Sequence, residues 1–332
     1  MVKLASIDLG SNSTRLLITE MTDDKFNILH RMHVVTKMAE NLEQTREISK
    51  PAYKRVDLAL RKFKKLLIEN DVSDVFIVGT AALRDAKNSN EIIENIRKKY
   101  DFEVEVLSGH DEGITTSLGV LHFIENTENF LIVDIGGRST ELIYECDNKI
   151  ISKSLNLGVV TLTEKFFPNL PTNRKSINEA KLDVETKLSK LNIKDKKQVI
   201  GVSGTALSLA SIFLDQQKFD EDKLHEVRID LDSVYEINDR LLKMSEAEII
   251  TKFKGLDPKR AATITSGVFL LKLILNHYSN SSIIISKYDI LEGLILKNTK
   301  LDISPGGGIG RRDGLKIRYS KGCGGSSPPP GT

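Results

Sequence analysis

Two short polar motifs with the same residue order carry the clearest chemical signal in the sequence. Residues 8–14 read Asp-Leu-Gly-Ser-Asn-Ser-Thr, and residues 134–140 read Asp-Ile-Gly-Gly-Arg-Ser-Thr. Glycine lets a backbone approach a ligand closely, and successive N–H groups with Ser and Thr hydroxyls can surround phosphate oxygens. An aspartate beside such a loop offers an oxygen ligand for Mg²⁺, which usually binds through one or two carboxylates plus substrate phosphates. The phosphate contacts predicted from these motifs are Gly10, Ser11, Asn12, Ser13, Gly136, Gly137, Arg138 and Ser139.

An apolar run precedes each motif, and another follows it. Residues 4–7 and 15–18 flank the first motif, and residues 130–133 and 141–144 flank the second. This context places each motif at the tip of a β-hairpin, and the repetition indicates one such hairpin in each of two domains. Two ordinary tight turns are the alternative. The same turn chemistry in the same context favours a pair of loops that hold a phosphate chain from both sides.

Composition excludes several classes of protein. The chain has 332 residues, of which 40% are hydrophobic and 28% charged, which is typical of a globular protein with about two domains. The formal net charge is only +2, which argues against a general nucleic-acid binder. The two cysteines are far apart in sequence, so neither a disulfide framework nor a zinc motif is expected. With no apolar run of membrane-spanning length and no signal segment, we expect a cytoplasmic protein without a membrane partner.

Alternating strand and helix patterns predict the α/β fold class. The strand pattern starts at residue 3 and restarts at residue 130, which agrees with the repeated motif. Strands are expected at 3–8, 15–20, 26–35, 75–78, 103–107, 130–134, 141–145, 149–155, 198–202 and 282–285. Helices are expected at 51–70, 88–100, 110–125, 159–167, 176–192, 205–216, 231–243, 258–277 and 289–298.

With these motifs in order, the sequence resembles the exopolyphosphatase and guanosine pentaphosphate phosphohydrolase family, within the superfamily of actin, sugar kinases and heat-shock chaperone ATPases. The resemblance covers nearly all of residues 1–300. It implies two ribonuclease H-like domains, each with a mixed sheet flanked by helices, and an active site in the interdomain cleft. It also implies Mg²⁺-dependent removal of a terminal phosphate by water. The motifs that carry it are ASIDLGSNSTRLLI, GTAALRDAKN, LSGHDEG, LIVDIGGRSTELI, SLNLGVVTLTEKF, GVSGTALSLA, GLDPKRAATI and ISKYDILEGLIL.

The resemblance also implies roles for individual residues. Glu112 matches the catalytic glutamate that would orient and deprotonate the attacking water, although its neighbour Asp111 could also reach a water. Arg84 would bind phosphate and offset its charge, the alternative being a surface ion pair with Asp85. Asp134 and Glu141 match the magnesium-side carboxylates, and Glu141 has the alternative of a solvated strand residue. The remaining matches are Asp8, the equivalent of Asp134 in the first half, and Gly204 and Thr205, which open a helix that either holds phosphate or packs the domain.

Arg138 departs from the family pattern, which usually has a glycine at this position. The added side chain and charge could strengthen the grip on polyphosphate or hinder the backbone approach. The residues do not decide between these, and our hypothesis is that Arg138 contacts the substrate chain.

The motifs lead us to expect an exopolyphosphatase that acts on inorganic polyphosphate. Guanosine pentaphosphate is the alternative substrate, and an ATP-dependent kinase or a non-catalytic phosphate-binding protein are less favoured. The expected domains are residues 1–125 with 286–303, and residues 126–285. Residues 304–332, rich in Gly and Pro, are expected to form a disordered tail, either natural or derived from an expression vector. A homodimer is typical of the family.

Overall fold

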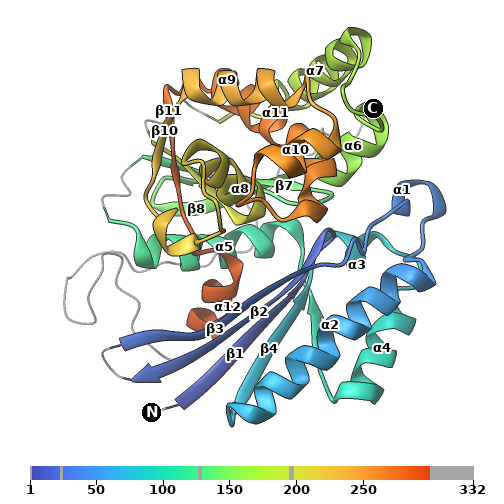
Figure 1. Cartoon of the computed structure of the whole chain (residues 1–332). Helices are drawn as coiled ribbons and strands as arrows, with labels where there is room; N and C mark the ends of the chain where they lie inside the picture. Colours follow the sequence, from blue (N-terminus) through green and yellow to red (C-terminus); the bar gives the residue numbers. More distant parts are fainter. Residues whose placement is uncertain (1, 23–24, 126–128, 194–197, 300–332) are drawn as a thin grey trace, which may run out of the picture.

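The computed structural model describes residues 2–22, 25–125, 129–193 and 198–299. The predicted tail at 304–332 lies outside the described residues. Figure 1 shows two halves, each built on a β-sheet, with helices on the outside of both and between them. None of the helices within the described ranges has the length and apolar character needed to span a bilayer.

The two sheets repeat one topology. The first has the order β3-β2-β1-β4-β5, and the second has the order β10-β11-β9-β6-β7-β8. In both, the first three strands of the unit are antiparallel neighbours and the next strand adds in parallel, as β1 with β4 and β6 with β9. The repetition confirms the two mixed sheets expected from the restart of the motif. The strands are β1 Val2–Leu9, β2 Ser13–Thr22, β3 Lys25–Val35, β4 Asp74–Gly79, β5 Val104–Val106, β6 Phe130–Ile135, β7 Thr140–Cys146, β8 Lys149–Leu155, β9 Gln198–Val202, β10 Arg228–Asp230 and β11 Ser282–Ile285.

Helices cover both faces of each sheet, so most strand residues are buried. On the first sheet, α2 and α4 share an apolar core with β1 and β2, and α12 packs on the other face through Leu291 and Ile295. On the second sheet, α11 lies in the large core, and α5 covers the opposite face. The helices are α1 Leu42–Thr45, α2 Lys50–Glu69, α3 Ala81–Asp85, α4 Ser89–Tyr100, α5 Gly109–Phe123, α6 Val159–Phe166, α7 Arg174–Leu188, α8 Ser203–Phe213, α9 Leu231–Leu241, α10 Glu246–Lys252, α11 Ala261–His277 and α12 Ile290–Asn298, with short 3₁₀ turns η1 Glu221–Lys223 and η2 Pro258–Arg260.

Helices α5 and α12 cross between the two sheets with their backbones in contact. A Cβ atom at Gly119 would lie 1.9 Å from the Asp289 carbonyl oxygen, and one at Gly293 would lie 1.8 Å from that of Thr115. Only glycine fits at either position. The close crossing brings the start of α12 and the start of α5 to the space between the two hairpins.

Each predicted strand and helix has a counterpart in the structure, and four short elements, α1, α3, β10 and α10, were not predicted. Elements of three to seven residues carry too little periodicity to be found in this way. Helix α10 did have a local signal, because Ser245 and Glu248 form a capping box at its start.

Candidate active site

The tips of the two equivalent hairpins meet and close with the same turn. The Gly10 N–H donates to the Ser13 carbonyl at 3.0 Å, and the Gly136 N–H donates to the Ser139 carbonyl at 2.9 Å. A Cβ atom at Gly137 would lie 2.8 Å from the Ser11 Cβ, so the second tip contacts the first. The structure therefore brings together the two motifs that the sequence repeats.

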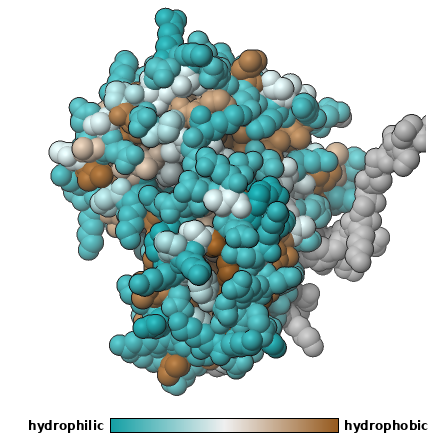
Figure 2. All heavy atoms as spheres, turned by 90° about the vertical axis from the view of Figure 1, so that its right-hand side faces the viewer, coloured by the Kyte–Doolittle hydropathy of each residue, from teal (hydrophilic) through white to brown (hydrophobic). Residues whose placement is uncertain are grey.

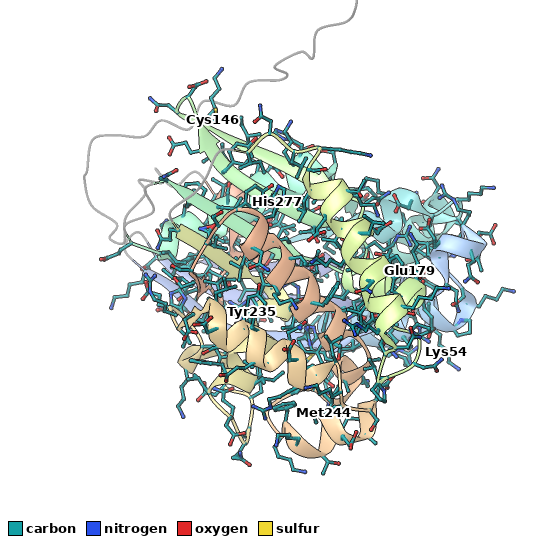
Figure 3. The ribbon with its side chains drawn as sticks, turned by 90° about the horizontal axis from the view of Figure 1, so that it is seen from above. Lys54, Cys146, Glu179, Tyr235, Met244 and His277 are labelled. Carbon is teal, nitrogen blue, oxygen red and sulfur yellow. The ribbon has the colours of Figure 1, made fainter. Side chains whose placement is uncertain are left out.

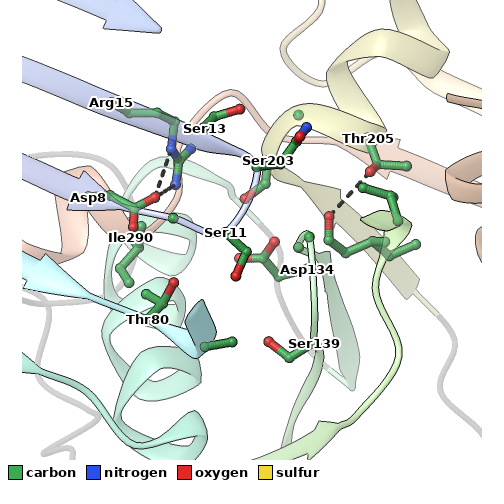
Figure 4. A pocket seen from close by; sticks show the side chains of 18 of the residues that line it. Asp8, Ser11, Ser13, Arg15, Thr80, Asp134, Ser139, Ser203, Thr205 and Ile290 are labelled. Atoms are coloured by element: carbon green, nitrogen blue, oxygen red, sulfur yellow. Dashed lines mark hydrogen bonds and ion pairs between the residues drawn. The ribbon is translucent and has the colours of Figure 1, made fainter. Parts of the chain in front are cut away.

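A cavity lies between these tips and takes its lining from both halves of the molecule. Ser11, Asp134 and Ser139 surround its centre in Figure 4, with Thr80 to their left and Arg15 and Ser203 above. Every predicted site residue except Arg84, Arg138 and Glu141 is part of the lining. The lining includes Asp8, Gly10, Ser11, Asn12, Ser13, Arg15, His33, Thr80, Glu112, Asp134, Gly136, Gly137, Ser139, Ser203, Gly204, Thr205 and Arg260.

The two hairpins differ at one cross-strand pair. In the first, Asp8 faces Arg15, and the Arg15 Nη2 lies 2.8 Å from the Asp8 Oδ2. In the second, Asp134 faces Glu141 at the equivalent position. The first carboxylate is therefore neutralised by the fold, and Arg15 also pairs with Asp289 at the start of α12. The second hairpin instead holds two acids side by side.

This concentration of acid changes the pKa values. Burial, with Asp289 adding to it, raises the pKa of Asp134 to about 7. Burial and Asp134 raise the pKa of Glu141 to about 8. Glu141 is 1% exposed and accepts a hydrogen bond from Ser154 at 2.7 Å, so it is not a solvated strand residue. Both carboxylates would gain from a cation beside them.

The residues fit Mg²⁺ as a partial ligand set. The Asp8 Oδ1 is buried without a hydrogen-bond partner, and hard oxygen donors are what Mg²⁺ prefers. Among the described residues, no three acidic, histidine or cysteine side chains form a metal site by themselves. A site completed by substrate phosphates agrees with both observations.

Glu112, on the first turn of α5, lines the cavity together with Asp8 and Asp134. The Glu112 residue is buried at 9% exposure, and the Arg84 Nη1 lies 3.3 Å from its Oε2. Burial, then Glu141 and Asp134, raise its pKa well above the usual value for glutamate. Asp111 is exposed and accepts a hydrogen bond from the Ser108 hydroxyl at 2.7 Å. Of the two adjacent acids, the geometry therefore favours Glu112 for reaching a water in the cavity, and Arg84 does not form the surface pair with Asp85.

At the start of α8, the contact of Thr205 agrees with domain packing, one of the two roles expected for Gly204 and Thr205. The Thr205 hydroxyl donates to the Ile135 carbonyl at 3.2 Å, so it ties the helix to β6. At Gly204, a Cβ atom would lie 2.0 Å from the Arg260 Nη1. The glycine thus leaves room for a guanidinium in the cavity wall.

Arg260 and His33 were not assigned by the sequence analysis, although both line the cavity. The Arg260 Nη2 lies 2.6 Å from the His33 Nε2. None of the ion pairs found in the described part of the chain includes Arg260. Burial lowers the pKa of Arg260 to about 10, so it stays charged at neutral pH. The motif GLDPKRAATI contains Arg260, but a single arginine after a proline has no local signal for a phosphate site.

Arg138 does not occupy the place expected for it. Its side chain leaves the cavity and pairs with two acids of the first half, Glu43 and Asp85. In this structure the Arg138 guanidinium is paired with acids outside the cavity lining, and its predicted contact with a phosphate chain stays a prediction. The backbone of the tip is held against the first hairpin.

A second cavity of about 440 Å³ continues from the first. The two share Arg15, His33, Gly204 and Arg260 in their walls. The second wall is richer in apolar side chains and includes Leu207, Phe219 and Leu256, together with Lys218 and Lys254. A long ligand bound between the hairpins could extend past Arg260 into this space.

Comparison with known proteins gives consistent matches. The model of the Ppx/GppA phosphatase family matches residues 17–301. A bifunctional 3-dehydroquinate synthase/phosphatase of Fusobacterium nucleatum is 31% identical over 89% of the chain and 46% of that protein. A guanosine-5'-triphosphate,3'-diphosphate pyrophosphatase of Pseudoalteromonas atlantica is 29% identical over 88% of the chain and 57% of that protein. The chain thus spans about half the length of the curated relatives it matches.

Solved structures agree over nearly their full length. The Ppx/GppA family member of Aquifex aeolicus is 27% identical, with a TM-score of 0.77 over 89% of this chain and 97% of that one. An exopolyphosphatase of Cytophaga hutchinsonii is 25% identical, with a TM-score of 0.83 over 89% of this chain and 97% of that one. The two actin-like halves seen here are therefore the architecture of these proteins.

Proposed function

Because the chain belongs to the Ppx/GppA phosphatase family, we propose that it hydrolyses the terminal phosphoanhydride of inorganic polyphosphate and releases orthophosphate. The observation that supports this most is the buried Glu112 facing a cavity between two phosphate-type hairpins. The two hairpins alone would explain phosphate binding. A buried carboxylate beside them can also accept a proton from the attacking water, as hydrolysis requires. The solved relative from Cytophaga hutchinsonii is named an exopolyphosphatase.

The hairpins would hold the terminal phosphate groups. Backbone N–H groups and the hydroxyls of Ser11, Ser13 and Ser139 line the cavity on both sides. The Arg260 guanidinium adds a cation at the end where the remaining chain would leave. Binding in this orientation directs the terminal phosphorus toward Glu112.

Glu112 would accept a proton from water as the oxygen attacks the terminal phosphorus. The bond from that phosphorus to the bridging oxygen then breaks, and the shortened chain leaves with the bridging oxygen. A base with a raised pKa is suited to proton transfer near neutral pH, and the pKa of Glu112 is raised by burial and by neighbouring acids. Arg84, which contacts Glu112, would keep the carboxylate oriented.

Mg²⁺ is part of this proposal. Asp134, Glu141 and Asp8 would hold it together with substrate oxygens, directly or through water. When bound, it would supply positive charge that offsets the charge on the phosphates. The acidic pair of the second hairpin supports this, because burial raises the pKa of both Asp134 and Glu141 and a neighbouring cation would favour their charged forms.

The second cavity favours guanosine pentaphosphate as the second candidate substrate. Its volume of about 440 Å³ is within the range of pockets for small organic ligands. Leu207, Phe219 and Leu256 offer apolar surface for a base, which inorganic polyphosphate does not need. The match to the guanosine-5'-triphosphate,3'-diphosphate pyrophosphatase of Pseudoalteromonas atlantica agrees with this candidate.

A phosphate-release assay tests the proposal. The purified chain is incubated with long-chain polyphosphate or with guanosine pentaphosphate, with and without Mg²⁺, and orthophosphate is measured with malachite green. Mg²⁺-dependent release from polyphosphate is the expected result, and faster release from guanosine pentaphosphate would favour the second candidate. No release from either substrate, with binding retained, would support a non-catalytic phosphate-binding protein. ATP consumption that needs an added acceptor would support a kinase.

Three further expectations stay predictions. The domain division into 1–125 with 286–303 and 126–285 is one, and a homodimer is another. The third is a cytoplasmic location. The expected partners are inorganic polyphosphate or guanosine pentaphosphate, and no nucleic-acid partner is expected.

A further inference from the structure

Arg138 joins the two halves of the molecule beside the cavity. Its Nη2 lies 2.8 Å from the Glu43 Oε2, and its Nε lies 3.1 Å from the Asp85 Oδ2. Arg138 belongs to the tip of the second hairpin, whereas Glu43 is in α1 and Asp85 is in α3 of the first half. Arg138 is only 2% exposed, whereas the Glu43 and Asp85 side chains are 65% and 28% exposed. Helices α1 and α3 lie toward the right of Figure 1.

The backbone around Arg138 is fixed on two sides. Gly137 packs against Ser11 of the first hairpin, and a Cβ atom at Gly158 would lie 2.4 Å from the Arg138 backbone N. The side chain therefore starts from a rigid point. Movement of the two halves apart would have to break the contacts with Glu43 and Asp85.

The contact with Asp85 connects Arg138 to the proposed base. Asp85 and Arg84 are adjacent in α3, a helix of only five residues. Neighbouring residues on a helix point in directions about 100° apart, so Asp85 can reach the second half while Arg84 faces Glu112. Arg84 also donates to the Leu107 carbonyl at 2.8 Å. Holding Asp85 therefore sets the orientation of the short helix that carries Arg84.

A second contact between the halves lies nearby. The Asn41 N–H donates to the Glu164 Oε1 at 2.9 Å, which joins the segment before α1 to α6. Glu164 is not part of the cavity lining, so this contact has no evident part in binding. The same face of the molecule is mostly hydrophilic at its surface (Figure 2), which agrees with polar contacts between the halves there.

From these contacts, we propose that Arg138 is a positioning residue that holds the cleft closed and, through Asp85, keeps Arg84 against Glu112. The part of the proposal that concerns Arg84 and Glu112 rests on the hydrolytic function proposed above. Its structural part, closure of the cleft, does not depend on that function. A guanidinium can bond two carboxylates at once, which an ammonium cannot do in the same planar geometry.

Kinetic comparison of variants tests the positioning role. Arg138→Met removes the charge and keeps most of the length, and Arg97→Met, at an exposed arginine of α4, is the matched control. We expect Arg138→Met to lower kcat by about tenfold or more with KM changed less, because the hairpins that hold the phosphates are intact. Arg138→Lys should recover part of the loss. Asp85→Asn should lower kcat similarly, and the double variant should be no worse than either single one.

A distance measurement tests closure without any substrate. Spin labels are placed by Lys54→Cys on α2 and Glu179→Cys on α7, in a chain with Cys146→Ser and Cys323→Ser. Lys54 and Glu179 are exposed and lie toward the same side of the molecule in Figure 3, on different halves. Double electron–electron resonance should give one short distance for the parent and the Arg97→Met control, and an added longer distance for Arg138→Met.

Each outcome decides the proposal. If Arg138→Met equals the control in both distance and kcat, or opens the cleft without lowering kcat, Arg138 does not position Arg84. If the parent chain releases phosphate from neither substrate, the proposed function fails, while the distances still show whether Arg138 closes the cleft. Melting temperatures are measured for all variants. If a variant melts within a few degrees of the parent, its change in kcat or distance is not due to unfolding.

Discussion

The Arg260 Nη2 lies 2.6 Å from the His33 Nε2, and the pair joins a residue of β3 to the turn before α11. Because arginine only donates hydrogen bonds, the His33 Nε2 accepts and its proton is on Nδ1. Burial and then Arg260 lower the pKa of His33 to about 2, so the ring stays neutral near physiological pH. A neutral partner orients Arg260 without cancelling its charge, which remains available to an anion in the cavity.

Replacing Arg260 should weaken substrate binding. Arg260→Met keeps the length of the side chain and removes its charge. A hydrogen bond to a charged group contributes about 1.5–3 kcal/mol, so KM for polyphosphate should rise about 10- to 100-fold. Initial rates of phosphate release at several substrate concentrations measure this. An unchanged KM would show that Arg260 does not contact the substrate.

Gly204→Ala should also raise KM for polyphosphate, although it removes no charge. The new Cβ would lie 2.0 Å from the Arg260 Nη1, so the guanidinium has to move. We expect KM to rise in the wild-type background and to change little in the Arg260→Met background. Equal losses in both backgrounds would mean that the alanine disturbs α8 itself rather than Arg260.

The buried His33 should make the protein less stable in acid. Its pKa is about 2 when folded and about 6.5 when unfolded, so the unfolded chain binds more protons below pH 6.5. The unfolding free energy should therefore fall as the pH falls, by about 2 kcal/mol at pH 5. His33→Gln can still accept from Arg260 but does not titrate. Urea unfolding at pH 7.5 and pH 5 should show a smaller loss for His33→Gln, and parallel losses would contradict the assignment.

Glu112→Gln should abolish most of the hydrolysis and leave the fold intact. General base catalysis contributes typically about 10²- to 10⁴-fold, and kcat should fall by this amount. The matched control is Asp111→Asn on the neighbouring exposed residue, which should keep most of the activity. If the two variants behave alike, Glu112 is not the base.

The crossing of α5 and α12 should tolerate no side chain. In Gly293→Ala, the Cβ would lie 1.8 Å from the Thr115 carbonyl oxygen, which is backbone and cannot rotate away. Overpacking of this kind costs about 1–3 kcal/mol. Lys297→Ala, at an exposed position of the same helix, should change the unfolding free energy little. Thermal or urea unfolding of the two variants tests this difference.

Local sequence determined the two hairpins and their chemistry. Each hairpin is specified by a short motif between two apolar runs, and the strands that flank the tip pair with near neighbours in sequence, Asp8 with Arg15 and Asp134 with Glu141. Glu112, on the first turn of a helix, was predicted from the resemblance of its motif to a family rather than from a local pattern, and its catalytic role stays a prediction. Short elements such as β10 were not predicted, because three residues are too few to show a periodic pattern.

Tertiary structure decided which charges meet. Arg260 and His33 are 227 positions apart, and Arg138 reaches Asp85 over 53 positions. These pairs form because the two sheets pack together through α5 and α12. The packing brings side chains that are remote in sequence to opposite sides of the same cleft. A side chain at a turn can point into a cavity or away from it, and the choice depends on which opposite charge the other half presents. The local sequence therefore could not show that the Arg138 side chain pairs with Glu43 and Asp85.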